Sequence, residues 1–220
     1  GNVILDAVRN VVVNAIAPIS TTALTISATT ASIYSDVVAT GTAGFVSVDQ
    51  FYQGAGSWTQ IVPTLPSFNA TNFISNFGSR FLRAEGGNGS TADPYQLGDV
   101  YGLQGVNSSS FTNTSFVLAR DIDASRTANW VTFCCDADGF TPIQQSFSGD
   151  FDGAGHTIRG LYLDGFLEGD QFTYLDRALF MNIASTGVVH DLMMANTISY
   201  TGSGGLLAFT NNGTIQAVSV

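Results

Sequence analysis

The C-terminal half of the chain repeats itself. Three segments align without gaps, "HTIRGLYL" (156–163), "GVVHDLMM" (187–194) and "GTIQAVSV" (213–220), and each has apolar residues at its third, sixth and eighth places. A second track runs between them, with "ALFMNI" (178–183) matching "GLLAFT" (205–210). No such unit can bury its inward side chains alone, so the units must stack on one another.

Stacking of equal units predicts a parallel β-helix, in which equivalent strands lie about 4.8 Å apart and aliphatic side chains fill the interior. An antiparallel sandwich gives similar alternation, but it does not predict units of equal length with identical inward positions. We therefore expect an all-β, parallel β-helix (solenoid) with loop insertions and at most one short helix. The alignment predicts two inward columns, one of Ile158, Val189 and Ile215 and one of Leu161, Leu192 and Val218.

The composition agrees with an all-β fold. Only 11% of residues are charged, no lysine is present, and aspartate far outnumbers glutamate. Lysine and glutamate favour exposed helix faces, whereas aspartate favours turns. The net charge of −10, without a basic patch, argues against nucleic acid and anionic membranes as partners, and no apolar stretch has transmembrane length.

Three regions follow from the spacing of apolar residues. Residues 1–53 form short alternating runs and are expected to be β-helix coils. In residues 54–115 the rhythm breaks at prolines and glycine-rich text, which predicts an extra-helical insertion with a short helix near 98–106, capped by Asp99. Residues 116–220 are expected to be further coils.

Two loops are expected to interrupt these C-terminal coils, at 126–140 and 164–177. The chain also begins and stops inside strand-like text. We therefore expect further coils of a parent chain to be among its partners.

Aspartates recur as Asp-x-Asp pairs, including "GDFDGAGHT" around Asp150 and Asp152. The favoured interpretation is a plain corner, with Gly153 and Gly155 at positive φ. Asp136 and Asp138 could instead coordinate calcium, although an EF-hand is excluded because its twelfth position would be Phe147 rather than glutamate. A hydrolytic carboxylate pair is the third alternative. We expect no catalytic residue and no cofactor other than such a calcium ion.

The two histidines, His156 and His190, occupy different places in the aligned units. No His-x-x-x-His or Cys-x-x-Cys motif accompanies them, so no metal role is expected for either histidine.

Cys134 and Cys135 are adjacent in the sequence. They are either two reduced thiols or a strained vicinal disulfide, whose Cα atoms would lie closer than in an ordinary disulfide. Such a ring beside aromatic side chains would give an apolar platform on which sugars stack. The candidate ligand-binding residues are the aromatic side chains Trp130, Phe133, Phe172 and Tyr174.

The combination of "DIDAS", "FDGAGHTI" and "GGLLAFTNNGTI" resembles the GLUG-motif repeat region of filamentous-haemagglutinin-like bacterial surface adhesins, which are two-partner secretion exoproteins. The resemblance covers residues 79–220. It implies a right-handed parallel β-helix that serves adhesion or matrix building outside the cell. The double cysteine departs from the short glycine-rich loop of that pattern.

Together these features predict a non-enzymatic fragment of a secreted bacterial adhesin at the cell surface or in a biofilm matrix. It would be a rigid stalk or binding module for host or matrix glycans or glycoproteins. Two alternatives are a β-helical polysaccharide-cleaving enzyme and a purely structural spacer.

Overall fold

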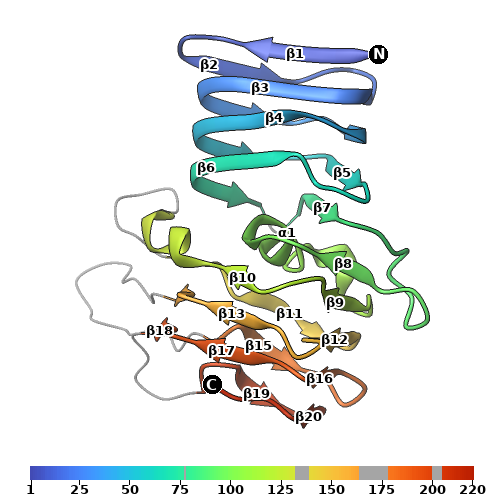
Figure 1. Cartoon of the computed structure of the whole chain (residues 1–220), viewed down its shortest axis with the longest axis vertical. Coiled ribbons are helices and arrows are strands. Elements are labelled where there is room, and N and C mark those ends of the chain that lie inside the picture. The colour runs from blue at the N-terminus through green and yellow to red at the C-terminus, as the bar shows by residue number, and fades with distance from the viewer. Residues whose placement is uncertain (77, 132–138, 164–177, 200–204) are drawn as a thin grey trace.

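A computed structural model describes residues 1–76, 78–131, 139–163, 178–199 and 205–220. The chain forms a parallel β-solenoid of about 9 turns, which confirms the predicted fold class (Figure 1). Every ladder between the named strands is parallel.

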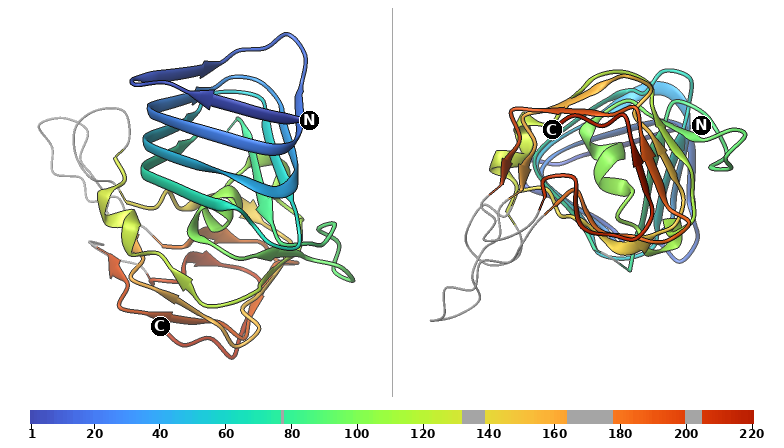
Figure 2. Two further views of the ribbon diagram at one scale, coloured as in Figure 1. Left: turned by 45° about the horizontal axis from the view of Figure 1, so that its top comes forward. Right: turned by 90° about the horizontal axis from the view of Figure 1, so that it is seen from below.

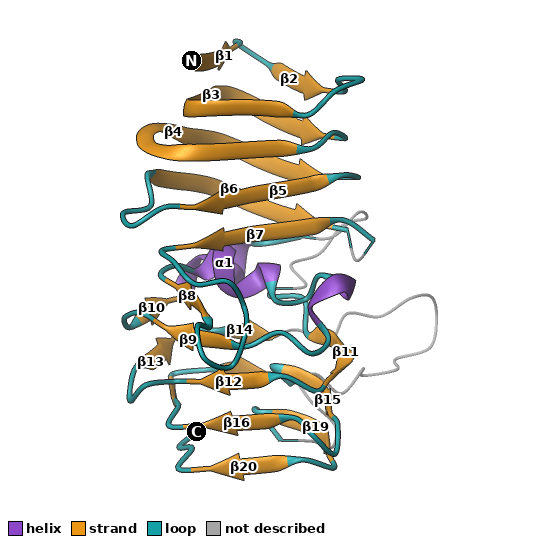
Figure 3. Ribbon diagram, turned by 90° about the vertical axis from the view of Figure 1, so that its right-hand side faces the viewer, coloured by secondary structure: helices purple, strands orange, loops and turns teal. Residues whose placement is uncertain are grey.

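The N-terminal half is a single seven-stranded sheet. Its longest strands bend around the coil, so that β3 pairs with both β1 and β2, and β4 pairs with both β5 and β6 (Figure 3). The strands are β1 (Asn2–Asp6), β2 (Asn10–Val13), β3 (Ile19–Ile33), β4 (Val37–Gln53), β5 (Ser57–Ile61), β6 (Ser67–Ser75) and β7 (Arg80–Ala84).

The C-terminal half has shorter strands in four narrow sheets, with the orders β8-β9-β12-β16-β20, β10-β13-β17, β11-β15-β19 and β14-β18. Each sheet forms part of the wall of the coil. The strands are β8 (Tyr95–Leu97), β9 (Phe116–Leu118), β10 (Ile122–Asp123), β11 (Ile143–Phe147), β12 (Asp150–Asp152), β13 (Thr157–Arg159), β14 (Tyr162–Leu163), β15 (Phe180–Ile183), β16 (Val188–His190), β17 (Met193–Ala195), β18 (Ile198–Ser199), β19 (Ala208–Asn211) and β20 (Thr214–Gln216).

The expectation that residues 54–115 leave the β-helix is wrong. Strands β5, β6 and β7 continue the same sheet as β4, and β8 pairs with β9. Pro63 and Pro66, which suggested a break, lie in the loop between β5 and β6 and leave the ladder hydrogen bonds intact. Proline interrupts a strand only where it sits inside the ladder.

The short helix expected near 98–106 is confirmed as α1 (Val100–Gly105). Asp99 caps it, because its carboxylate accepts a hydrogen bond from the amide of Gly102 at 2.9 Å. All six helical residues are buried, and the helix lies inside the coil in the end-on view (Figure 2). Two 3₁₀ helices follow, η1 (Ser109–Phe111) and η2 (Ser125–Asn129). No helix of the described residues is long and apolar enough to cross a membrane.

Helix α1 joins the two halves of the solenoid. The Tyr101 hydroxyl donates to the carbonyl of Ala70 in β6 at 3.0 Å. On the other side, the Gln104 amide exchanges two hydrogen bonds, of 2.8 and 2.9 Å, with the backbone of Thr141. A Cβ at Gly105 would lie 2.2 Å from the carbonyl oxygen of Phe81, so only glycine lets the helix approach β7 so closely.

Aromatic rings fill the interior around this junction. Phe51 stacks on Phe73, with ring centroids 5.3 Å apart, and Trp58 stacks on Phe81 at 5.8 Å. Trp130 continues the cluster on the C-terminal side, where it stacks on Tyr101 at 5.9 Å and on Phe140 at 6.4 Å. The two halves therefore share one continuous core.

The predicted register of the last three coils needs correction. Val189 is fully buried and pairs with Ile215, as expected. Its partner in the preceding coil is Phe151, however, whereas Ile158 pairs with Met194. Ile158 and Val189 thus lie in different sheets of the solenoid.

Of the second predicted column, Leu192 does lie beside Val218, whereas Leu161 belongs to a different sheet. The cause is an alignment shifted by one whole strand. It matches β13 and β14 to β16 and β17, whereas the ladders pair β13 with β17 and β14 with β18. The segments 187–194 and 213–220 are aligned correctly, because β16 pairs with β20 and Met193 with Ser219.

Phe151→Ala should lower the free energy of unfolding by about 3–5 kcal/mol, because it leaves a cavity in the core. The Phe151 ring is fully buried and meets the Phe180 ring edge-on at 5.5 Å. Phe209, in the same half and 45% exposed, is the matched control, and Phe209→Ala should cost under about 1 kcal/mol. Urea denaturation of both variants measures the difference. Equal losses would contradict the inward placement of Phe151.

Arg83 is the buried cation at the junction, with a side chain only 2% exposed. Its Nε donates to Asp99 Oδ2 at 2.7 Å, and its two terminal nitrogens donate to Gln60 Oε1 and to the carbonyl of Pro66. The guanidinium also lies over the ring of Phe68, 5.3 Å from its centroid. Each of its three guanidinium nitrogens thus has a hydrogen-bond partner within the fold, which offsets the cost of burying the charge.

Arg83→Ala should therefore destabilise the protein by about 3–5 kcal/mol, because buried Gln60 and the carbonyl of Pro66 lose their donor and Asp99 loses its ion pair. Arg159→Ala removes an arginine that is 56% exposed and 3.5 Å from Asp121, and it should cost at most about 1 kcal/mol. Chemical denaturation provides the measurement. A loss below about 1 kcal/mol for Arg83→Ala would show that the ion pair does not hold the junction.

Candidate functional site

The most concentrated group of chemically active side chains surrounds His190, at the end of β16. In the parallel register His190 lies beside Asp152 of the preceding coil, and Asp150 lies two residues earlier on the same strand, β12. Asp191 follows His190 directly. Because alternate residues of a strand share a face, Asp150, Asp152 and His190 meet on the outer wall of the solenoid. Asp191 lies just past the end of β16, at a positive φ of 51°, and its carboxylate contacts the same imidazole. We call Asp150, Asp152, His190 and Asp191 the His190 cluster.

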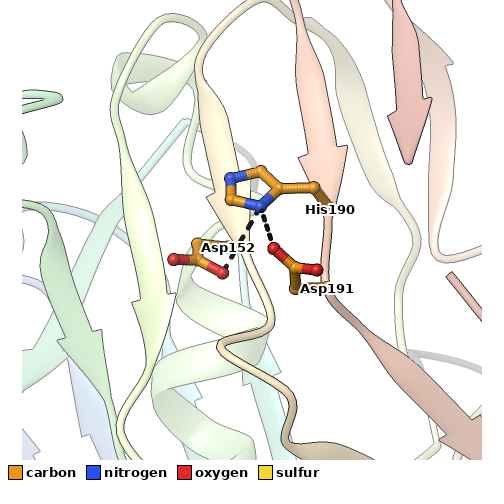
Figure 4. A group of neighbouring side chains, drawn as sticks. All are labelled: Asp152, His190 and Asp191. Carbon is orange, nitrogen blue, oxygen red and sulfur yellow. Dashed lines mark hydrogen bonds and ion pairs between the residues drawn. The ribbon is translucent and has the colours of Figure 1, made fainter. Parts of the chain in front are cut away.

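The imidazole stands between carboxylates on both of its nitrogens. Nδ1 lies 2.8 Å from Asp191 Oδ2 and 3.6 Å from Asp152 Oδ1 (Figure 4). Nε2 lies 3.1 Å from Asp150 Oδ1, an oxygen that is shielded from solvent. Asp152, His190 and Asp191 each offer one ligand atom, and these three atoms lie within 4.8 Å of one another.

The carboxylates raise the pKa of His190 above its usual value. The hydrogen bond that the imidazole donates to Asp191 is the largest cause, and the charges of Asp152, Asp150 and Asp191 add to it, while partial burial of the ring acts in the opposite direction. Within the described residues, no arginine forms an ion pair with any of these three aspartates. The histidine is therefore the only described cation that balances them.

Two shallow grooves flank the His190 cluster. Asp152 and Asp191 line one of them, together with Ala154, Met193 and Ala217. On the other side of the imidazole, Asp150 lines a second groove with residues of the neighbouring coils, among them Thr91, Ser115, Thr186 and Val188. The side chains that meet at Nδ1 are thus open to solvent, whereas the carboxylate oxygen at Nε2 is not.

The corner after Asp152 confirms the predicted turn but changes its details. The Asp152 Oδ1 atom accepts a hydrogen bond from the amide of Ala154 at 2.7 Å. Gly155 has the expected positive φ, of 76°. The second positive φ, of 50°, belongs to Ala154, whereas it was expected at Gly153. Gly153 is required for a different reason, since a Cβ there would lie 2.3 Å from the carbonyl oxygen of Asp191.

His156 has a simpler environment. Its Nδ1 lies 3.3 Å from Asp121 Oδ1, and Arg159 shares the same carboxylate at 3.5 Å. A hydrogen bond from the amide of Thr157 is the main cause that lowers the pKa of Asp121, and the contacts of His156 and Arg159 add to it. The site thus pairs one carboxylate with two basic groups, the reverse of the balance around His190.

The other predicted site residues fall into two sets. Trp130 is only 1% exposed and packs in the core, so its predicted place on a ligand-binding surface is wrong. The large ring was needed to fill the space next to α1. The remaining predicted residues lie outside the described parts of the chain, namely Phe133, Cys134, Cys135, Asp136, Asp138, Phe172 and Tyr174.

A third groove, of about 420 Å³, lies on the outer face of the N-terminal sheet. Ser27, Ser47 and Asn69 lie side by side across β3, β4 and β6 along its floor. Arg126 of η2 lines it as well and donates a hydrogen bond to Asn69 Oδ1 at 3.2 Å. In the sequence, this groove is indicated only by small polar residues at alternate positions. Whether such residues from different coils lie side by side depends on the register between the coils.

Comparison with known proteins gives one match. The chain is 32% identical over 176 residues to halomucin of Haloquadratum walsbyi (strain DSM 16790 / HBSQ001). It resembles a segment of halomucin. The match covers 75% of this chain but only 2% of the relative, so it concerns a small part of a much longer protein. No protein-family profile matches the chain, and no solved structure matches it.

The raised pKa of His190 makes the stability of the fold depend on pH. Below the unfolded pKa of about 6.5 the imidazole is protonated in both states, and the favourable contacts with the aspartates are fully present. These contacts are lost as the pH rises through the folded pKa. The free energy of unfolding should therefore fall as the pH rises above about 6.5 and through the folded pKa of His190.

His190→Gln should flatten this part of the pH profile, whereas His156→Gln should leave it in place. An NMR titration of the imidazole signals gives the pKa of His190 directly, and Asp191→Asn should lower it. A His190 pKa at or below the value of the unfolded chain would contradict the geometry described for the cluster.

Proposed function

We propose that this chain is a rigid, non-catalytic segment of an extracellular surface protein that projects and binds carbohydrate or glycoprotein. The observation that carries the proposal is the continuous parallel stack with a polar groove on its outer wall. A solenoid of this kind presents an elongated surface with fixed spacing, which suits binding of extended chains.

The similarity to halomucin supports a place in a long surface protein, because the match spans a small part of that relative. The resemblance of "FDGAGHTI" and "GGLLAFTNNGTI" to GLUG-type repeats supports adhesion or matrix building as the finer role, at the cell surface or in a biofilm. Further coils of the parent chain would then be partners of the stack.

The side chains that line the groove over β3, β4 and β6 indicate which class of ligand it would bind. Ser27, Ser47 and Asn69 repeat at the strand spacing of about 4.8 Å, so hydroxyl and amide groups follow one another along the solenoid axis. Asp49 and Arg126 add one acceptor group and one set of strong donors. Such a row of mixed donors and acceptors matches the hydroxyl groups of a glycan.

We propose that the aspartates stabilise turns and do not act as catalytic carboxylates. Asp123 Oδ1 accepts from the amide of Ser125 at 2.9 Å, and Asp99 Oδ1 accepts from the amide of Gly102. Carboxylates that hold their own turns in this way serve local structure. A polysaccharide-cleaving enzyme would instead need two carboxylates free to face a bound sugar chain.

A glycan array with the purified chain tests the proposal. Binding should appear for at least one class of extended polysaccharide, and Arg126→Ala should weaken it roughly tenfold or more, because a charge-assisted hydrogen bond is lost. Arg159→Ala, which removes an exposed arginine outside the groove, should leave binding unchanged.

Absence of binding to every glycan and glycoprotein tested would favour a structural spacer. A reducing-sugar assay separates the remaining alternative. Turnover of a polysaccharide that is abolished by an Asp→Asn change would overturn the non-catalytic role.

A further inference from the structure

The His190 cluster holds three potential metal ligands from two adjacent coils. Asp152 comes from β12, while His190 and Asp191 come from the end of β16 in the next coil. The two aspartates present carboxylate oxygens to the same imidazole nitrogen, Nδ1, at 3.6 and 2.8 Å. An ion bound there would therefore link neighbouring coils of the solenoid.

The spacing of the ligand atoms fits a small divalent ion. Metal–ligand distances of about 2.0–2.2 Å for zinc place neighbouring ligand atoms roughly 3.0–3.5 Å apart. The distance from His190 Nδ1 to Asp152 Oδ1 is near this range, and the distance to Asp191 Oδ2 needs to open by only a few tenths of an ångström. Open solvent on the groove side leaves room for water to complete the coordination.

The position of Asp150 also supports a metal site, independently of the spacing of the ligand atoms. Its Oδ1 atom is shielded from solvent and lies 3.1 Å from His190 Nε2, on the side of the ring away from the other two aspartates. Among the described groups this oxygen has no hydrogen-bond partner, so it is a shielded, unpaired acceptor whose charge favours the tautomer with the proton on Nε2 and Nδ1 free for the ligand position. Carboxylates orient many metal-binding histidines by a hydrogen bond to the far ring nitrogen, and Asp150 lies within reach of such a bond.

The charge balance favours a cation at this place. Three carboxylates meet one imidazole, and among the described residues no arginine pairs with any of the three. At His156 the balance is opposite, since Arg159 shares the only carboxylate and would repel a metal ion. Among the described residues, only Asp152, His190 and Asp191 bring three potential ligand atoms of histidine, cysteine or carboxylate side chains within 4.8 Å of one another.

We propose that Asp152, His190 and Asp191 bind a divalent transition-metal ion of the zinc class, with Asp150 as the positioning residue behind the imidazole. One nitrogen and two oxygen ligands suit zinc and its neighbours better than calcium, which prefers six or more oxygen ligands. The site crosslinks two coils, so its effect is on the stability of the stack.

Isothermal titration of the metal-free full chain with zinc tests the site, with calcium as the comparison ion. The experiment uses a background with Cys134→Ser and Cys135→Ser, because thiolates are themselves zinc ligands. We expect one zinc ion per chain and a melting temperature raised by roughly 5 °C at a hundredfold excess over the dissociation constant.

His190→Gln and Asp152→Asn should each weaken zinc binding at least tenfold, and Asp150→Asn should weaken it by about ten- to a hundredfold through loss of orientation. His156→Gln is the matched control and should bind zinc like the parent. Circular dichroism establishes that each variant is folded. In addition, zinc should shift the NMR signal of the His190 Nδ1 nitrogen in the parent.

Three outcomes would overturn the proposal. The first is zinc binding that is unchanged in His190→Gln, which would place the ion elsewhere in the chain. The second is calcium binding as tight as zinc and insensitive to His190→Gln. The third is no detectable zinc binding together with an unshifted His190 signal.

Discussion

Each coil of this solenoid depends on its neighbours, because the inward side chains of one coil are covered only by the coils next to it. Phe151 and Val189, for example, are fully buried because they pair in adjacent coils, with Val189 covered in turn by Ile215. Parallel pairing places like positions side by side, so apolar columns inside and polar columns outside arise from the same register. The polar groove and the His190 cluster are both consequences of this alignment.

The junction at α1 is the exception to that rule. The seven-stranded sheet ends at β7 and the five-stranded sheet begins at β8, and no ladder between named strands of the described chain crosses from one to the other. The helix fills the interior at this level, and its side chains make the connections on both sides. Gln104 binds the backbone of Thr141, while Asp99 both caps the helix and holds the buried Arg83.

Much of this was predictable from sequence, and the limits have physical causes. Alternation and repetition predict the parallel stack, and the position of Asp99 before an apolar periodic segment predicts α1. Register was not predictable, because successive short strands carry the same alternating pattern, and the sequence alone does not show that β16 pairs with β12 instead of β13. The His190 cluster depends on that register. The burial of Trp130 depends on α1 filling the coil, which local patterning does not reveal.

The absence of a strand ladder at α1, within the described chain, has a mechanical consequence. Backbone hydrogen bonds between coils run along the solenoid axis, so a pull along that axis passes through every coil in series. In such a series the level with the fewest ladder bonds yields first. Here that level has no strand ladder and is held by two backbone hydrogen bonds of Gln96, with Glu85 and Gly86, together with an ion pair, two side-chain amide bonds and aromatic contacts. The stack is thus built as two stiff rods joined by one softer element.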